Sequence, residues 1–167
     1  FEKELNKIIS SVDKNLNFII SGSYRRNKKK SGDIDILLSH SKIITKKVLK
    51  RIDQTYIDQI VDKLDNKFKH IGTLAKGLTK YMGLHTIYNK VRHIDIIFMP
   101  MESYYSAMLY FTGSKEHNIK MRDRAKKMGY VLNEWGLIKP DKTLFNVKSE
   151  KHLFDILNMD YLEPEYR

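Results

Sequence analysis

The chain has 167 residues, of which 41% are hydrophobic and 31% charged, enough for one domain or two small subdomains of a soluble globular protein. Lysine and arginine outnumber aspartate and glutamate by 31 to 20, and the formal net charge of +11 favours a polyanionic partner, although a basic surface without a specific ligand is the alternative. Because cysteine is absent, disulfides and thiolate metal sites are excluded, and no apolar run approaches the ~20 residues of a membrane span, so we expect an intracellular protein without membrane contact.

The first hundred residues predict two helices and five strands. Apolar residues recur at helical spacing over residues 1–16 and again from Ile57 to Leu64. Short apolar or alternating runs predict the strands, which cover residues 17–20, 33–39, 68–74, 79–88 and 91–98. Turns are expected at residues 75–78 and 89–90, and the polar segment before the second helix is expected to be a surface connection.

The pattern changes after Pro100, where helices replace strands. Residues 101–111 predict an aromatic, apolar helix. Residues 115–128 predict a strongly charged helix, which Ser114 can cap at its start and Gly129 can end.

The rest of the chain predicts a strand or hairpin arm from Tyr130 to Ile138 and a last helix capped by Ser149. No internal repeat or low-complexity linker is present. We therefore expect an α+β protein with two subdomains: a sheet with covering helices over residues 1–100, and a small, mainly helical part over residues 101–167.

Three aspartates stand on predicted strands. Asp33 and Asp35 are two residues apart, so both side chains point to one face while Ile34 points to the core. Neighbouring carboxylates repel each other unless a cation lies between them, and such hard oxygen ligands suit Mg²⁺. Asp95 lies among apolar residues, where an acid is costly unless it is paired or bound to metal. The three aspartates predict a metal site, and the alternatives are two solvated surface acids and a structural salt bridge.

A glycine-containing turn precedes the first of these strands. Gly22 and Ser23 can offer backbone N–H groups and a hydroxyl to phosphate, and Gly32 directly precedes Asp33. The stretch from Gly22 to Leu38 therefore predicts a site for a metal ion and a triphosphate.

Gly-Ser-x-x-Arg, a short spacer and Gly-Asp-x-Asp resemble the signature of the nucleotidyltransferases, and the fuller string resembles the family X DNA polymerases. The likeness runs through nearly the whole chain, and Tyr-Phe-Thr-Gly-Ser at residues 110–114 is much more specific than Gly-Asp-x-Asp. It implies a nucleotidyltransferase palm with a mixed or antiparallel sheet, followed by a nucleotide- and template-binding subdomain. The lyase and helix-hairpin-helix segments that usually precede the palm have no counterpart here, which fits either a minimal viral-type member or a fragment.

The resemblance implies a template-directed DNA polymerase that extends a primer 3′-OH with two Mg²⁺ ions, for which Mn²⁺ can substitute, in gap-filling base excision repair. Asp33, Asp35 and Asp95 would be the catalytic and metal-binding residues. The residues expected to bind the nucleotide are Gly22, Ser23, Arg26, Gly32, Tyr110, Phe111, Gly113 and Asn118. The residues expected to contact DNA are Lys76, Thr79, Lys80, Arg122, Glu134 and Trp135.

The expected partners are a dNTP and gapped or primer-template DNA, and the protein is expected to be a monomer. A cellular protein of this kind is expected in the nucleus, and a viral one at a viral replication site or in the cytoplasm. Three residues depart from the family: Lys115 where an acid stands beside the incoming base, and His93 and Ile97 where arginines stand near the third aspartate. The rival functions are another nucleotidyltransferase, such as a tRNA-nucleotidyl or small-molecule adenylyltransferase, and an inactive palm that only binds nucleic acid.

Overall fold

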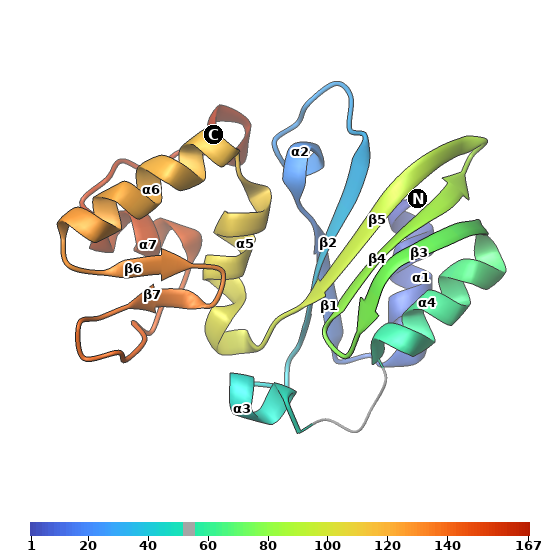
Figure 1. Ribbon diagram of the computed structural model, residues 1–167, viewed down its shortest axis with the longest axis horizontal. Helices are drawn as coiled ribbons and strands as arrows, with labels where there is room; N and C mark the ends of the chain where they lie inside the picture. The colour runs from blue at the N-terminus through green and yellow to red at the C-terminus, as the bar shows by residue number, and fades with distance from the viewer. Residues whose placement is uncertain (52–55) are drawn as a thin grey trace. The chain divides into compact units, whose positions relative to one another are not determined.

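The structure is a computed structural model that describes residues 1–51 and 56–167. The chain forms two compact units (Figure 1): the first comprises residues 1–20 and 31–101, and the second comprises residues 21–30 and 102–167. The segment that follows the first strand thus belongs with the C-terminal residues rather than with the sheet. Within the described ranges, no helix combines the length and the apolar character needed to span a membrane.

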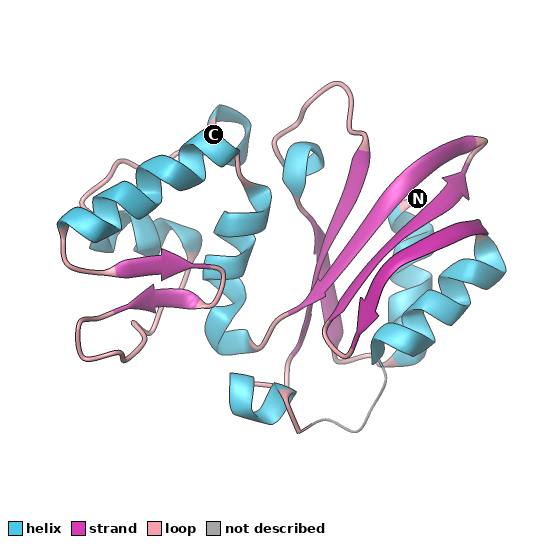
Figure 2. Ribbon diagram, viewed as in Figure 1, coloured by secondary structure: helices cyan, strands magenta, loops and turns pink. Residues whose placement is uncertain are grey.

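A five-stranded sheet with the order β1-β2-β5-β4-β3 forms the first unit (Figure 2). β1 (Leu16–Ile20) is antiparallel to β2 (Asp33–His40), and β2 is parallel to β5 (Lys90–Phe98). β4 (Lys80–Ile87) lies antiparallel between β5 and β3 (Lys69–Gly77). The parallel pair makes the sheet mixed, which confirms the predicted α+β class.

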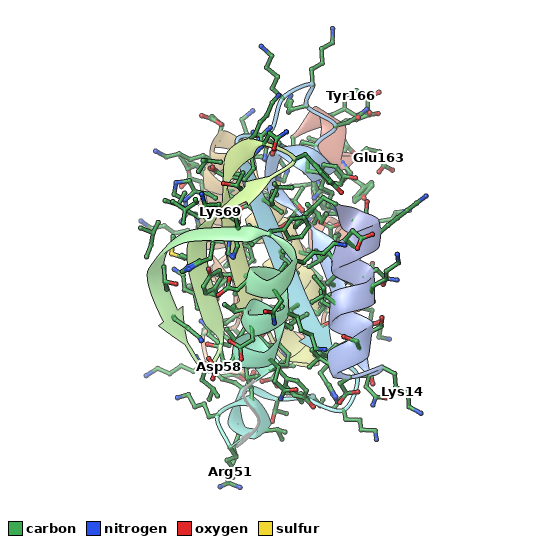
Figure 3. All side chains as sticks on the ribbon, turned by 90° about the vertical axis from the view of Figure 1, so that its right-hand side faces the viewer. Lys14, Arg51, Asp58, Lys69, Glu163 and Tyr166 are labelled. Carbon is green, nitrogen blue, oxygen red and sulfur yellow. The ribbon has the colours of Figure 1, made fainter. Side chains whose placement is uncertain are left out.

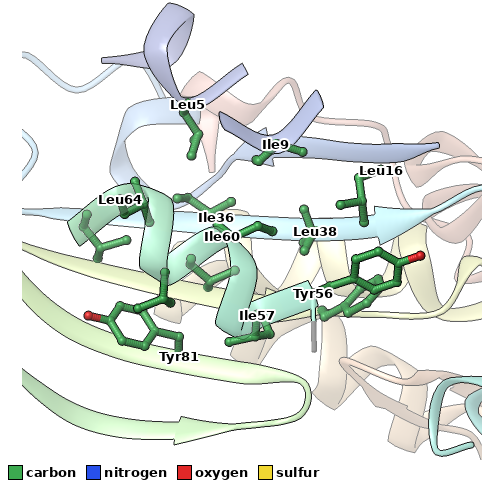
Figure 4. Close-up of a cluster of buried hydrophobic side chains, with 14 of the residues drawn as sticks. Leu5, Ile9, Leu16, Ile36, Leu38, Tyr56, Ile57, Ile60, Leu64 and Tyr81 are labelled. Atoms are coloured by element: carbon green, nitrogen blue, oxygen red, sulfur yellow. The ribbon is translucent and has the colours of Figure 1, made fainter. Parts of the chain in front are cut away.

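Two helices, α1 (Glu2–Val12) and α4 (Tyr56–Lys67), lie on the same side of this sheet (Figure 3). Their apolar stripes pack on alternate strand residues (Figure 4), and the buried cluster includes Leu5, Ile9, Ile36, Leu38, Ile57, Ile60, Leu64, Tyr81, Ile94 and Ile96. Because successive strand residues point to opposite faces, the residues between these core positions on β2 and β5 face away from the helices.

Three features of this unit differ from the sequence prediction: the end of the first helix, the end of β3 and an additional short helix. α1 ends at Val12 rather than at residue 16, because the Asp13 carboxylate accepts the backbone N–H of Asn15 at 2.8 Å in a local turn that competes with the helix. β3 continues to Gly77, which pairs with Lys80, so the expected turn at 75–78 is wrong. The predicted surface connection contains a one-turn helix, α3 (Lys46–Leu49).

The second unit is mainly helical. Its helices are α2 (Gly22–Arg25), α5 (Tyr104–Thr112), α6 (Lys115–Lys127) and α7 (Glu150–Ile156). Short 3₁₀ turns lie at Met101–Ser103, where the chain passes from the first unit into the second, and at Pro164–Tyr166. A two-stranded hairpin, β6 (Val131–Asn133) and β7 (Gly136–Ile138), confirms the predicted hairpin arm. A separate core is formed by Leu109, Met121, Ala125, Leu132, Leu137, Leu153, Phe154 and Leu157.

Two predicted helix caps are confirmed. The Ser114 hydroxyl accepts the backbone N–H of His117 at 3.3 Å, and the Ser149 hydroxyl accepts that of His152 at 3.0 Å. Each satisfies one of the backbone donors that the first turn of a helix leaves without a partner.

Candidate active site

The parallel pairing of β2 with β5 brings the predicted metal ligands together. Asp35 is the direct cross-strand neighbour of Asp95, and Asp33 is paired with His93. Residues paired across neighbouring strands share a face, so all three aspartates lie on the face opposite the hydrophobic core. The sequence places Asp33 and Asp35 on one strand, and the fold adds Asp95 from a strand about sixty residues later.

Asp95 has an unusual electrostatic environment. Burial raises the pKa of its carboxyl group, and Asp33 adds to the increase, whereas His93 and Lys80 act in the opposite direction. Its Oδ1 atom is buried and has no hydrogen-bond partner among the described residues. A buried carboxylate oxygen without a donor is costly, and a cation bound beside it would offset the cost.

The carboxylate set fits a divalent cation in chemical type, because oxygen donors suit Mg²⁺. In residues 1–51 and 56–167, however, no three histidine, aspartate or glutamate side chains are gathered closely enough to hold an ion. Asp33 is exposed, and Asp35 and Asp95 are half-buried. The three-carboxylate site therefore stays a proposal, resting on strand register and on the unpaired oxygen of Asp95.

The predicted phosphate-binding glycines differ in their surroundings. Gly22, in the second unit, is buried and has a φ of 57°, a conformation that favours glycine, and it begins α2 together with Ser23. Gly32, in the first unit, is exposed, and a Cβ added there would meet nothing within 4 Å. The backbone therefore requires a glycine at position 22, and no such requirement is visible at position 32.

Several predicted nucleotide-binding residues meet where α5 ends and α6 begins. Arg26 donates through Nη1 to the Thr112 carbonyl oxygen, and its Nε is buried without a partner among the described residues. Gly113 has a φ of 71°, and a Cβ there would lie 3.0 Å from Nη1 of Arg26, so a larger residue would press on that guanidinium. Asn118 donates its side-chain amide to the Tyr110 carbonyl oxygen at 2.7 Å.

The aromatic pair at the end of α5 belongs to the same junction. The Tyr110 and Phe111 rings are both half-buried and meet edge to face, with centroids 5.1 Å apart. This contact holds two adjacent side chains in defined orientations, with part of each surface accessible.

A buried ionic network, which the sequence does not predict, supports this junction. Both terminal nitrogens of Arg25 donate to the Glu150 carboxylate, at 2.9 and 2.6 Å, and Nη1 also donates to the Thr112 hydroxyl at 2.7 Å. Arg167 donates to the same carboxylate at 2.6 Å. Burial alone would raise the pKa of Glu150, but the hydrogen bonds from the two arginines outweigh it and lower the pKa.

Only part of this network has a sequence signal. The adjacent Arg25 and Arg26 follow the glycine turn, where paired arginines suggest an anionic partner. Glu150 and Arg167 lie more than a hundred residues further along and carry no motif, so sequence reasoning could not connect them to Arg25.

The DNA-contacting residues predicted in the first unit lie on or beside the β3–β4 hairpin. Lys76 forms an ion pair with Asp58 on α4 at 2.7 Å, and the hydrogen bond that its ammonium donates to the Asp58 carboxylate raises the lysine pKa. Lys80 is exposed, and the Thr79 carbonyl accepts the backbone N–H of Phe98 at 2.8 Å. A phosphate contact by Lys76 would therefore compete with Asp58.

The DNA-contacting residues predicted in the second unit lie on α6 and in the β6–β7 turn. Arg122 is exposed, and Glu134 and Trp135 are half-buried. The Trp135 carbonyl accepts the Ser103 hydroxyl at 2.8 Å, which ties the turn to the start of α5.

Comparison with known proteins places these features in a family. The DNA polymerase beta palm family matches residues 1–101, and the DNA polymerase beta thumb family matches residues 107–167. A crystal structure of Leishmania infantum polymerase beta, a ternary P/T complex, is similar with a TM-score of 0.84 and 31% identity, over 99% of this chain and 72% of that chain.

Curated relatives with similar sequences are also DNA polymerases. DNA polymerase lambda of Arabidopsis thaliana is 27% identical over 185 residues, covering 99% of this chain, and that of Rattus norvegicus is 29% identical over 172 residues, covering 89%. DNA polymerase IV of Saccharomyces cerevisiae is 31% identical over 96 residues, covering 57% of this chain and 16% of the relative. The chain spans only 34% and 28% of the two lambda polymerases.

The mixed sheet, with Asp-x-Asp on one strand and a third aspartate on the next, lies within the residues that the DNA polymerase beta palm family matches. With a thumb that matches over residues 107–167, the chain belongs to the family X DNA polymerases. The resemblance found in the sequence is thereby confirmed.

Proposed function

We propose that this chain is a template-directed DNA polymerase that adds a dNMP to a primer 3′-OH, with gap-filling repair as its role. The observation that carries the proposal is the cross-strand pairing of Asp35 with Asp95, beside Asp33. Carboxylates placed side by side on neighbouring strands, one of them with an unpaired buried oxygen, form a costly arrangement that a bound cation would stabilise. Family membership supports the same reaction class.

In this proposal, Asp33 and Asp35 would hold one divalent ion that serves the triphosphate, and all three aspartates would hold a second ion that serves the primer 3′-OH. Bound Mg²⁺ ions would supply Lewis-acid chemistry, lowering the pKa of the 3′-OH and neutralising charge on the attacking and leaving oxygens. Each aspartate must be ionised to act as a ligand. The raised pKa of Asp95 therefore means that acid would protonate this carboxylate at a higher pH than an ordinary aspartate.

The second unit supplies the proposed nucleotide contacts. Arg26 is oriented by the Thr112 carbonyl and, with Ser23, would neutralise the departing pyrophosphate. Tyr110 and Phe111 would contact the sugar and exclude a 2′-OH. The amide of Asn118 is oriented by the Tyr110 carbonyl and would contact the minor-groove edge of the new base pair.

Lys80 and Arg122 are the strongest of the proposed DNA contacts, because both are exposed and neither forms an ion pair with another described residue, whereas Lys76 does. Phosphate contacts of this kind position the duplex and do not read its sequence. That the chain acts as a monomer inside the cell stays a prediction from the sequence.

The test is single-nucleotide insertion with Mg²⁺ on four gapped duplexes that differ only in the templating base, beside a single-stranded primer alone. We expect each template base to direct insertion of its complement and the lone primer to remain unextended. Efficient tailing of the lone primer would show a template-independent enzyme, and tight DNA binding without insertion would show an inactive palm.

A further inference from the structure

Three consecutive lysines, Lys28, Lys29 and Lys30, follow α2 and have no part in the reaction proposed above. We call them the lysine loop. All three are exposed, and within the described ranges none forms an ion pair with a carboxylate. Neighbouring like charges repel each other, so the loop favours an anionic ligand.

The turn that leads into the lysine loop is fixed by backbone hydrogen bonds. Asn27 adopts a left-handed conformation with a φ of 56°, its N–H donates to the Tyr24 carbonyl at 2.9 Å, and the Lys28 N–H donates to the Ser23 carbonyl at 3.1 Å. These two bonds form the Schellman motif that ends many helices, with asparagine at the position where glycine is commonest. The first lysine is therefore held against Ser23, the residue proposed above to contact the triphosphate.

The residues at the base of the lysine loop, Arg25 and Arg26, are held in place, and the charge of Arg26 is not neutralised by a carboxylate. Arg25 is bound on both terminal nitrogens by Glu150, so its own charge is neutralised while α2 is held in place. Arg26 donates to a carbonyl oxygen, that of Thr112, and forms no ion pair within residues 1–51 and 56–167. Arg26 and the three lysines thus leave four positive charges within five residues on a fixed base.

We propose that the lysine loop captures polyphosphate: it attracts the triphosphate of the incoming nucleotide and retards release of the pyrophosphate product. The inference rests on the proposed function, because the choice of a polyphosphate ligand follows from the phosphate contact proposed there for Ser23. Lysine suits this task because its ammonium is a compact charge on a flexible stem and needs no fixed geometry. Charge focused beside a site raises the rate of ligand capture by roughly 10- to 1,000-fold.

The test compares two triple variants. K28S/K29S/K30S removes the lysine loop, and K42S/K47S/K50S removes the same charge from exposed lysines in and around α3. Binding of inorganic tripolyphosphate, a dNTP and gapped duplex DNA is measured separately by calorimetry, at about 0.1 M and about 1 M salt. Tripolyphosphate needs no template and no catalysis, so its binding reports on the loop alone.

At about 0.1 M salt we expect the loop variant to lose about tenfold in affinity for tripolyphosphate and dNTP, with DNA affinity equal to that of the control variant. At about 1 M salt, where the Debye length falls from about 10 Å to about 3 Å, the difference should vanish. Equal losses in both variants would overturn the proposal, and so would a loss of DNA affinity as large as the loss for nucleotide.

Failure of this inference can be told apart from failure of the proposed function. A parent protein that incorporates nucleotides, while the loop variant binds tripolyphosphate as tightly as the parent, refutes the lysine loop and leaves the polymerase intact. A parent that never incorporates, but whose tripolyphosphate binding depends on the loop, refutes the polymerase and supports the loop.

Discussion

The half-buried Asp95 and the buried His117 are titratable residues, each with buried side-chain atoms that lack hydrogen-bond partners among the described residues, yet their surroundings differ. Asp95 is the cross-strand neighbour of Asp35, at the place where we propose that an ion binds. His117 lies in the second core, with its ring 5.6 Å from that of Phe154, and both of its ring nitrogens are unpaired. The first arrangement is useful to a metal site, and the second is a cost to stability.

The cost at His117 predicts a pH dependence. Burial lowers the pKa of His117 from its ordinary 6.5 to about 4, with Arg167 and Lys120 lowering it and Glu150 opposing them. As the pH falls from about 6.5 to about 4, the unfolded chain binds a proton that the folded chain does not, so the free energy of unfolding falls by up to about 3 kcal/mol. H117F should remove this part of the dependence and stabilise the protein at pH 5.

Urea unfolding followed by the fluorescence of Trp135, the single tryptophan, measures this change in the unit that contains His117. H70F, at an exposed histidine on β3, is the control and should leave the slope of stability against pH as it is. An unchanged slope in H117F would contradict the assignment.

Strand β4 depends on a glycine for packing rather than for its backbone angles. Tyr81 is fully buried, and its ring and hydroxyl occupy the space that a Cβ on Gly83 would need. G83A should therefore destabilise the protein by about 1–3 kcal/mol through overpacking. Denaturant unfolding measures the change, with G77A on β3 as the control, since a Cβ there meets nothing within 4 Å.

A double variant tests the cause. Y81L shortens the side chain that Gly83 makes room for, so G83A combined with Y81L should cost less than the sum of the two single changes. Simple additivity would show that Tyr81 is not the reason for the glycine.

The connection between α2 and α7 depends on one carboxylate. E150Q would remove the charge shared by Arg25 and Arg167 and leave the partly buried Arg25 and the buried Arg167 without this counter-ion. Breaking a buried pair in this way typically costs about 3–5 kcal/mol. Because the bond to Glu150 holds α2 in place through Arg25, and α2 begins with the proposed phosphate-binding residues, we also expect a higher KM for the dNTP under conditions in which the variant remains folded.

Thermal unfolding and single-nucleotide kinetics measure the two effects of E150Q. E165Q, at an exposed position near the C-terminus, is the control and should change neither stability nor KM. A folded E150Q protein with the stability of the parent would show that the network contributes little.

Across the whole molecule, the sequence predicts the features that depend on residues close to one another along the chain. Alternation on two strands identifies Asp33, Asp35 and Asp95 as strand acids opposite a core, and local spacing identifies the caps at Ser114 and Ser149. The direct pairing of Asp35 with Asp95 and the meeting of Arg25 with Glu150 depend on contacts between distant segments, which no local pattern encodes. The end of α1 is missed for a different reason, a side chain that competes with the helix.

The same division separates the two functional parts of the chain. The proposed metal site lies wholly in the first unit, and the turn from Gly22 to Arg26, with the Glu150 carboxylate that binds Arg25, lies wholly in the second. The chain returns to the sheet after residue 30, so the basic segment of residues 21–30 precedes the strand that carries Asp33 and Asp35 of the proposed metal site. Substitutions in the first unit should therefore affect metal binding, whereas substitutions in the second should affect direct contacts to the phosphates.

The most direct test of the metal-dependent reaction is Mg²⁺-dependent insertion by D33N, D35N and D95N, beside D62N, which changes an exposed acid on α4. Each of the first three should lose at least about 100-fold in rate, and D62N should match the parent. D95N should be as stable as the parent or more so, because the change removes a buried charge. Folded D95N protein that inserts nucleotides within about tenfold of the parent rate, a difference of only about 1.4 kcal/mol in barrier, would contradict the three-carboxylate site.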